Sequence, residues 1–230
     1  MKKEVKINGS TIQLHTYSDA DESVFNEIMI ERDYKILDDL IKSTPYPIID
    51  IGAHIGVFTA YCRSLNTEVP ILCIEPDQRN FEILKKNIKT NNFKNIIVKQ
   101  IGIADKQGPQ TLYINEDSHN HSIIPQKDQN FTDKKEVYCT TLENITKKYF
   151  QTHKKIALLK MDCEGAEFQI IESTPIEILQ KFQTIYIEYH EISKKLQSQE
   201  IVKKLKSAGF KVRKTPSHYH KKMGFILAKH

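Results

Sequence analysis

Several features that would assign a chain to a common class are absent from this sequence. It has no apolar run long enough to cross a bilayer, which argues against membrane-spanning helices. Its first residues are followed by polar positions rather than by the apolar core of a signal peptide. It also has no internal repeat, low-complexity tract or linker between domains. For 230 residues, 39% of them hydrophobic, we therefore expect one cytoplasmic structural domain with a full core.

Cysteine is scarce as well. The four cysteines are Cys62, Cys73, Cys139 and Cys163, and they include no C-x-x-C pair, which argues against a zinc ribbon. Cys73 and Cys139 fall in apparent strands. We expect the cysteines to be reduced and mostly buried, as in a cytosolic protein.

The usual glycine motifs of nucleotide sites are missing, although two glycines follow an apolar strand. The stretch Asp50-Ile-Gly-Ala-His-Ile-Gly56 precedes a helical pattern, as in the first turn of a doubly wound α/β domain. Its spacing is not G-x-G-x-x-G, and no Lys follows the second glycine, so it is neither a dinucleotide fingerprint nor a P-loop. An acid at the strand end favours a cationic ligand such as S-adenosylmethionine. The alternative is a purely structural turn.

A second acid supports this interpretation. Glu75, followed by Pro76, ends the next predicted strand about one βαβ step later. Its carboxylate can accept hydrogen bonds from both hydroxyls of a ribose. The third strand, Ile96–Val98, leads to the segment Ile101–Asp105, where backbone amides and the Ile103 side chain would flank an adenine.

The candidate catalytic groups follow two later strands. Asp162 and Glu164 come directly after the strand Ile156–Met161, and His190 follows the strand Thr184–Glu188. The carboxyl ends of neighbouring strands meet at the ligand site of an open α/β sheet. A hydroxyl acceptor must lose its proton as its oxygen attacks. We assign that role first to Asp162 and then to His190, with Glu164 as a further candidate; loop and packing roles are the alternatives for the last two.

The same cluster raises the question of a metal. Together with Glu188, it offers hard oxygen ligands and one imidazole, which would suit a divalent cation. The spacing is not a recognised ligand pattern, so our prediction names no metal ligand.

Two regions flank these motifs. Residues 1–44 show an Asn-Gly hairpin pattern and then a helical pattern from Asp19, which we expect to pack as a hairpin and one helix on a domain of residues 45–230. The polar loop 115–135 is either a substrate lid or a mobile surface loop. If it is a lid, its candidate acceptor contacts are His119, His121 and Ser122.

Charge is unevenly distributed along the chain. The formal net charge is +5, but residues 193–230 hold eleven Lys or Arg and one acid, a net +10 that leaves −5 for the rest. Such a segment could meet RNA, an acidic glycan or an anionic membrane surface. Because no aromatic-interleaved Arg pattern accompanies the lysines, solvated faces of a helix and a hairpin are the alternative.

Taken together, these motifs resemble the FkbM-type methyltransferases. The likeness covers roughly residues 45–190, and its most specific element is Leu159-Lys-Met-Asp-Cys-Glu-Gly-Ala-Glu167. Two positions depart from the family pattern: Glu143 stands where Asp is usual, and His54 stands where Asn is common. The resemblance implies a class I methyltransferase fold, a Rossmann-like three-layer sandwich with a mostly parallel seven-stranded sheet and an antiparallel last strand. It implies cofactor contacts from Asp50, Gly52, Ala53, His54, Gly56, Glu75, Pro76, Ile103 and Asp162.

The predicted function follows from this resemblance. It implies S-adenosylmethionine as methyl donor and O-methylation of a sugar or other small-molecule hydroxyl. The acceptor and the oligomeric state do not follow from the sequence. Two alternatives remain: an RNA methyltransferase that uses the basic C-terminal segment, and a non-catalytic S-adenosylmethionine-binding module.

Overall fold

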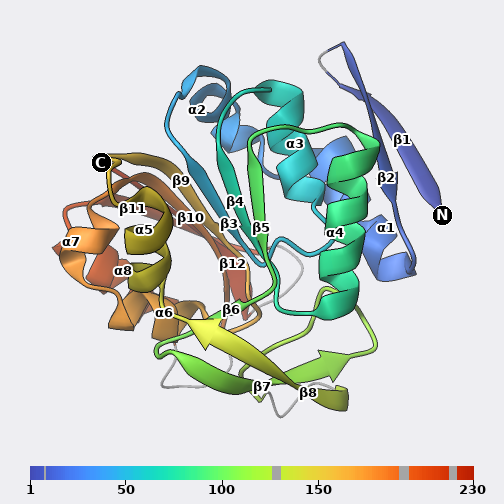
Figure 1. Cartoon of the computed structure of the whole chain (residues 1–230). Helices are drawn as coiled ribbons and strands as arrows, with labels where there is room; N and C mark the ends of the chain where they lie inside the picture. The colour runs from blue at the N-terminus through green and yellow to red at the C-terminus, as the bar shows by residue number, and fades with distance from the viewer. Residues whose placement is uncertain (8, 126–130, 192–196, 218–221) are drawn as a thin grey trace.

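The computed structural model describes the whole chain except residues 8, 126–130, 192–196 and 218–221. Its centre is a seven-stranded sheet in the order β11-β12-β10-β9-β3-β4-β5 (Figure 1). All neighbours pair in parallel except β12, which runs antiparallel between β10 and β11. The sheet predicted for a class I methyltransferase is thus confirmed. The strands are β3 (Ile48–Ile51), β4 (Ile71–Ile74), β5 (Ile96–Lys99), β9 (Ile156–Met161), β10 (Phe182–His190), β11 (Lys211–Pro216) and β12 (Met223–Lys229).

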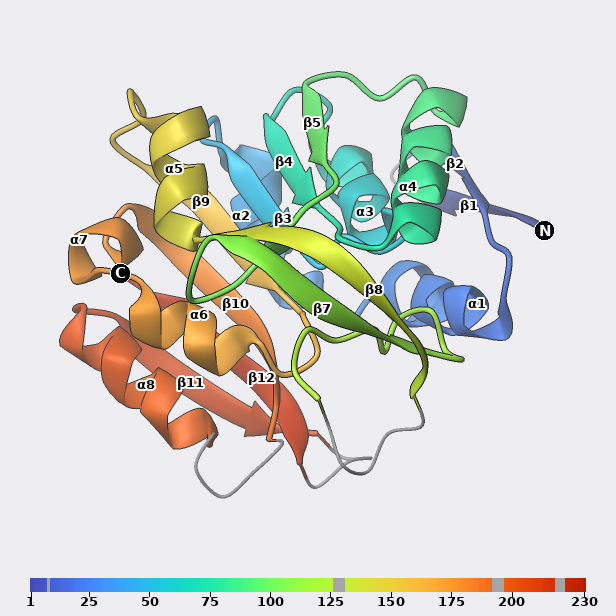
Figure 2. The ribbon, with the colours of Figure 1, turned by 60° about the horizontal axis from the view of Figure 1, so that its bottom comes forward.

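Helices cover both faces of this sheet, because successive side chains of each central strand point to opposite sides. In β3, Ile49 and Ile51 pack into one apolar cluster, whereas Ile48 packs into the other. One face carries α2 (Asp38–Ser43), α3 (Val57–Leu65) and α4 (Gln78–Thr90). The other carries α5 (Leu142–Phe150), α6 (Glu167–Ser173), α7 (Ile176–Leu179) and α8 (Ser198–Ser207) (Figure 2).

The N-terminal region contains the predicted hairpin, made of β1 (Lys2–Ile7) and β2 (Ser10–His15). The prediction of a single helix after this hairpin is wrong. The chain instead forms α1 (Asp19–Phe25), the π-helical turn η1 (Asn26–Glu31), the 3₁₀ turn η2 (Lys35–Leu37) and then α2. The break occurs at Arg32, whose φ of 61° is left-handed and ends the preceding turn. The cap of α1 is Ser18, whose side chain accepts from the Asp21 N–H.

A small second sheet lies across the carboxyl ends of the central strands (Figures 1 and 2). It consists of β6 (Gly102–Ile103), β8 (Phe131–Thr140) and β7 (Gly108–Asn115), in that order. Strand β5, the third predicted strand, ends at Lys99. Ile103, which follows it, pairs with Thr140 and so belongs to the small sheet. The predicted loop 115–135 is shorter than expected because its last residues are already strand, and residues 126–130 lie outside the described part.

Two further expectations concern membrane-spanning helices and disulfide bonds. In the part of the chain that the structure describes, no helix is long and apolar enough to cross a membrane. The four cysteines are unpaired; Cys62, Cys73 and Cys139 are buried and Cys163 is half-buried, as predicted.

Candidate active site

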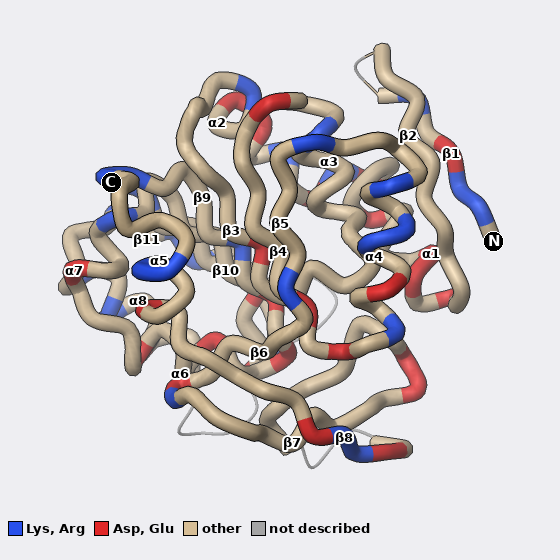
Figure 3. Tube along the Cα trace, in the orientation of Figure 1, with Lys and Arg blue, Asp and Glu red and all other residues tan. Residues whose placement is uncertain are grey.

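A cavity lies between the ends of β3, β4 and β9 and the small sheet. Most of the side chains and backbone segments predicted for the site line it, and acidic positions gather around the ends of the central strands in Figure 3. The structure brings together Gly52, Ala53, His54, Glu75, Pro76, Ile103, Asp162 and Glu164. Four predicted residues, Asp50, Gly56, Ser122 and His190, are not part of the lining.

The floor of the cavity is a backbone turn that only glycine can form. Gly52 has φ of 72°, and a Cβ there would lie 1.7 Å from the carbonyl oxygen of Asp162. The ends of β3 and β9 therefore approach each other more closely than any side chain allows. Gly56 acts at a distance from the cavity: with φ of 86°, it lets the start of α3 pack against the Leu84 side chain, whose Cδ1 would be 2.5 Å from an added Cβ. Gly56 thus has a packing role, and its contact with the cofactor stays a prediction.

Glu75 is held in place by backbone donors. One carboxylate oxygen accepts from the His54 N–H and the other from the Asp77 N–H, each at 2.9 Å. The side chain lines the cavity but is only 5% exposed. Burial raises the pKa of Glu75 to about 7, although both backbone hydrogen bonds favour the ionised form. The carboxylate is thus oriented in advance for a ligand that donates hydrogen bonds to it.

Asp50 lies behind the floor rather than on it, and its contact with the cofactor stays a prediction. The side chain is fully buried, accepts from the Thr59 hydroxyl at 3.0 Å, and lies 3.5 Å from the Lys160 ammonium. Lys160 in turn donates to the Gly52 carbonyl at 2.9 Å, which ties the pair to the glycine turn. Burial opposes the charge on Lys160, but Asp50 and Asp162 outweigh it and raise the lysine pKa.

Sequence reasoning missed the role of Lys160, although a signal was present. It is a single charged residue in the otherwise apolar strand β9, and it pairs in register with Asp50 of β3. A lysine inside an apolar strand needs a buried partner of opposite charge. Without the strand order, that partner could not be identified.

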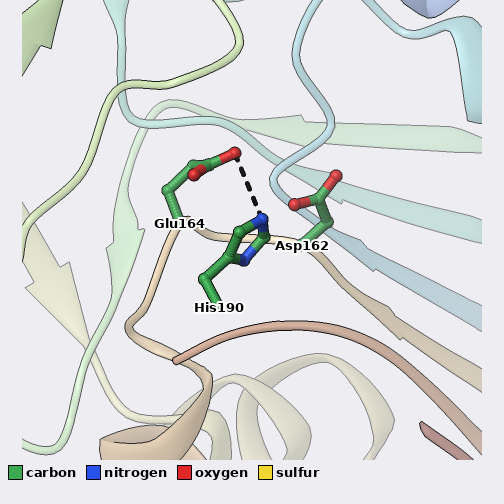
Figure 4. A group of neighbouring side chains, drawn as sticks. All are labelled: Asp162, Glu164 and His190. Atoms are coloured by element: carbon green, nitrogen blue, oxygen red, sulfur yellow. Dashed lines mark ion pairs between the residues drawn. The ribbon is translucent and has the colours of Figure 1, made fainter. Parts of the chain in front are cut away.

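The acceptor end of the cavity holds Asp162, Glu164 and His190 (Figure 4). His190 lies beneath the lining, with Nε2 at 3.6 Å from Glu164 Oε1 and Nδ1 at 3.5 Å from Glu167 Oε1. Burial raises the pKa of Glu164 to about 8. Burial alone would lower the pKa of His190, but the two glutamates raise it well above its ordinary value. The predicted catalytic groups therefore come together, with Asp162 the most exposed of them.

The connection from β7 toward β8 covers the cavity. The Ser118 hydroxyl donates to Asp21 at 2.7 Å and lies 3.0 Å from His54 Nε2, and its carbonyl accepts from Asn80 at 2.9 Å. The predicted contact Ser122 donates to the Glu164 carbonyl at 2.6 Å. This connection is thus fastened to the glycine turn by Ser118, which the sequence pattern did not single out, and to the acceptor end by Ser122.

Two histidines of the same connection, His119 and His121, line the cavity as predicted. Burial lowers the pKa of His119, and it lowers that of His121 to about 4. Both rings are therefore neutral at pH 7 and can donate or accept a hydrogen bond without adding charge.

Comparison with known proteins identifies the architecture around this cavity. The sequence matches the methyltransferase FkbM domain over residues 50–212. The chain belongs to this family of methyltransferases. Methyltransferase sdnD of Sordaria araneosa is 25% identical over 198 residues, which cover 74% of the chain and 75% of the relative. Methyltransferase 1 of Beauveria bassiana is 25% identical over 173 residues, which cover 65% of the chain and 66% of the relative.

Solved structures agree on the fold. The FkbM methyltransferase of Methylobacillus flagellatus superposes with a TM-score of 0.55 at 14% identity, over 80% of this chain and 43% of that longer one. Fibrillarin of Aeropyrum pernix, solved with natively bound S-adenosylmethionine, gives a TM-score of 0.55 at 11% identity, over 99% and 82% of the two chains. The chain is thus an FkbM-family methyltransferase with a class I fold, and its family implies S-adenosylmethionine as methyl donor.

Proposed function

We propose that this FkbM-family enzyme transfers the methyl group of S-adenosylmethionine to a hydroxyl of a sugar or another small molecule. The observation that carries the proposal is the position of two carboxylates, Glu75 and Asp162, on one cavity with the Gly52 turn as its floor. A ligand with ribose hydroxyls at one end and a cationic sulfonium near the other matches this charge pattern.

The cofactor half of the cavity fits an adenosyl group. Glu75 would accept from the ribose hydroxyls, Pro76 and Ile103 would flank the adenine, and Gly52 and Ala53 would lie along the cofactor with their backbone. Asn80 and Ser118 enclose this half because the Asn80 side chain donates to the Ser118 carbonyl. The chain would then hold the donor in one orientation, which is the main requirement for transfer from an already activated methyl group.

The acceptor half supplies the proton acceptor. Asp162 lines the cavity and its side chain is 30% exposed, so it can reach an acceptor hydroxyl while Glu164 and His190 lie deeper. As the acceptor oxygen forms its bond to the methyl carbon and the sulfur–carbon bond breaks, Asp162 takes the hydroxyl proton. The neutral rings of His119 and His121 would orient an uncharged acceptor by hydrogen bonds. The covered cavity favours a small acceptor over a polynucleotide.

The test is a methyl-transfer assay with labelled cofactor on panels of sugars, small hydroxyl compounds and RNA. It uses wild type, Asp162→Asn and the control Asp39→Asn, which alters an exposed carboxylate of α2 outside the cavity lining. We expect transfer to a small hydroxyl compound, and an Asp162→Asn turnover about 10²- to 10⁴-fold below the control. Transfer to RNA alone would refute the acceptor assignment. Full turnover in Asp162→Asn would remove Asp162 from the mechanism.

A further inference from the structure

Three potential ligand side chains meet at the acceptor end. One carboxylate oxygen each from Asp162 and Glu164 and one ring nitrogen of His190 all lie within 4.8 Å of one another. Figure 4 shows the ring and the two carboxylates turned toward a common space. Around a six-coordinate cation with bonds of about 2.1 Å, adjacent ligand atoms lie about 3 Å apart, so small side-chain rotations would close the set.

The environment of His190 is the second observation that points to a ligand. The residue is only 7% exposed, and its Nε2 is the ring nitrogen that faces the cluster, 3.6 Å from Glu164 Oε1. Behind it, Glu167 is fully buried and lies 3.5 Å from Nδ1. The N–H groups of Cys163 and Gly165 fix this carboxylate, at 2.9 Å and 3.0 Å. A carboxylate behind one nitrogen, with the other directed at a ligand space, is the usual support of a metal-binding histidine.

The charge at this end favours a cation. Asp162, Glu164 and Glu167 bring three carboxylates close to His190, and Glu188 lies two residues earlier on the same strand. The buried ammonium of Lys160 lies 3.8 Å from Asp162, but its hydrogen bond goes to the Gly52 carbonyl and its nearer carboxylate is Asp50. Buried carboxylates in excess are costly, and a divalent cation would offset that cost.

We propose that Asp162, Glu164 and His190 bind one divalent cation of the Mg²⁺ or Mn²⁺ class, which takes hard oxygen ligands and tolerates an imidazole. Three protein ligands leave positions for water or for an oxygen of the acceptor. Cation binding is independent of the proposed function, whereas the catalytic role of the cation rests on it.

In that role, the cation binds the acceptor hydroxyl and lowers its pKa. The proton passes to the Asp162 oxygen that does not bind the cation and then to water. The acceptor oxygen forms its bond to the methyl carbon, the sulfur–carbon bond breaks, and neutral S-adenosylhomocysteine leaves. The protonated product ether never forms, because the proton departs as the new bond is made.

The test measures Mn²⁺ binding by electron paramagnetic resonance and by calorimetry, with the full chain and without cofactor or acceptor. The variants are His190→Gln and Glu164→Gln, and His153→Gln serves as control because this histidine follows α5 and lies outside the cluster. Circular dichroism and thermal melting of each variant verify folding. We expect one Mn²⁺ per chain in wild type and control, competed by Mg²⁺, and at least tenfold weaker binding in both cluster variants.

Two results would overturn the inference: no saturable binding of Mn²⁺ or Mg²⁺ to the wild type at millimolar concentration, or equal Mn²⁺ binding by the wild type and both folded cluster variants. Cofactor binding is measured separately by calorimetry. If S-adenosylmethionine binds and the cations do not, only the cation site fails; if the cations bind and S-adenosylmethionine does not, the proposed function fails.

Discussion

The two ends of the cavity are built in different ways. At the cofactor end, the main-chain turn at Gly52 and the backbone donors that hold Glu75 determine the shape. At the acceptor end, the shape depends on side chains from separate elements: Asp162 after β9, His190 in β10 and His119 from the covering connection. One end is therefore fixed by steric fit of the backbone, and the other by the balance of buried charge. Substitutions in the backbone turn of the cofactor end should therefore abolish binding or folding. Substitutions of the charged side chains at the acceptor end should change activity or stability by degrees.

The largest effect should come from Gly52→Ala. The new Cβ would lie 1.7 Å from the Asp162 carbonyl oxygen. Because that oxygen belongs to the backbone, only a shift of the backbone can relieve the clash. We expect no detectable cofactor binding and a loss of about 4 kcal/mol or more of unfolding free energy, at the upper end for single substitutions. Calorimetry and urea unfolding measure both quantities.

Gly9→Ala is the matched control, because Gly9 has a similar φ of 79° but no atom within 4 Å of an added Cβ. Gly9→Ala should lose only about 1–2 kcal/mol of unfolding free energy, which is the cost of placing alanine in a left-handed conformation. Equal losses in the two variants would show that φ, rather than the close approach of β3 and β9, explains the need for glycine.

A somewhat smaller effect is expected from Lys160→Met, which leaves the Asp50 carboxylate buried without its cation. Breaking a buried ion pair from one side typically costs about 3–5 kcal/mol. The double variant Asp50→Asn/Lys160→Met removes both charges and should recover much of that loss in urea unfolding. If the double variant were less stable than the single one, charge balance would not be what holds these two strand ends.

The smallest effect concerns pH at the cofactor end. Ribose hydroxyls that donate to Glu75 would favour its ionised form, so cofactor binding should release a proton near the free-protein pKa of about 7. The dissociation constant should stay level above pH 7 and rise about tenfold per pH unit below it. Calorimetry between pH 5.5 and 8.5 measures this slope, and Glu75→Gln should remove it. An unchanged slope in that variant would assign the proton to another group.

The same carboxyl group affects the stability of the free protein in the opposite sense. The Glu75 pKa is about 7 in the folded chain and 4.5 in the unfolded chain. Between pH 4.5 and pH 7 the folded chain therefore holds a proton on Glu75 that the unfolded chain has lost. The contribution of Glu75 to stability is therefore highest at low pH and falls as pH rises through that window. Relative to Glu75→Gln, the wild type should lose melting temperature between pH 5 and pH 7.5.

The contrast between the ends also explains how much the sequence could predict. The central parallel strands, the glycine turn and Glu75 were predictable, because each depends on a local pattern a few residues long. The pair Asp50–Lys160 was not, because it depends on the register of β3 against β9. The left-handed Arg32, which divides the predicted N-terminal helix, carries no residue-type signal. Ser118 was also missed, because its partners Asp21 and His54 come from distant segments.

The measurement that tests the central claim most directly is a crystal structure of the chain with S-adenosylmethionine. The account predicts one cofactor over the Gly52 turn, with both ribose hydroxyls within hydrogen-bond distance of Glu75 and the methyl group facing Asp162. An empty cavity at saturating cofactor, or an adenosyl group bound away from Glu75, would contradict it.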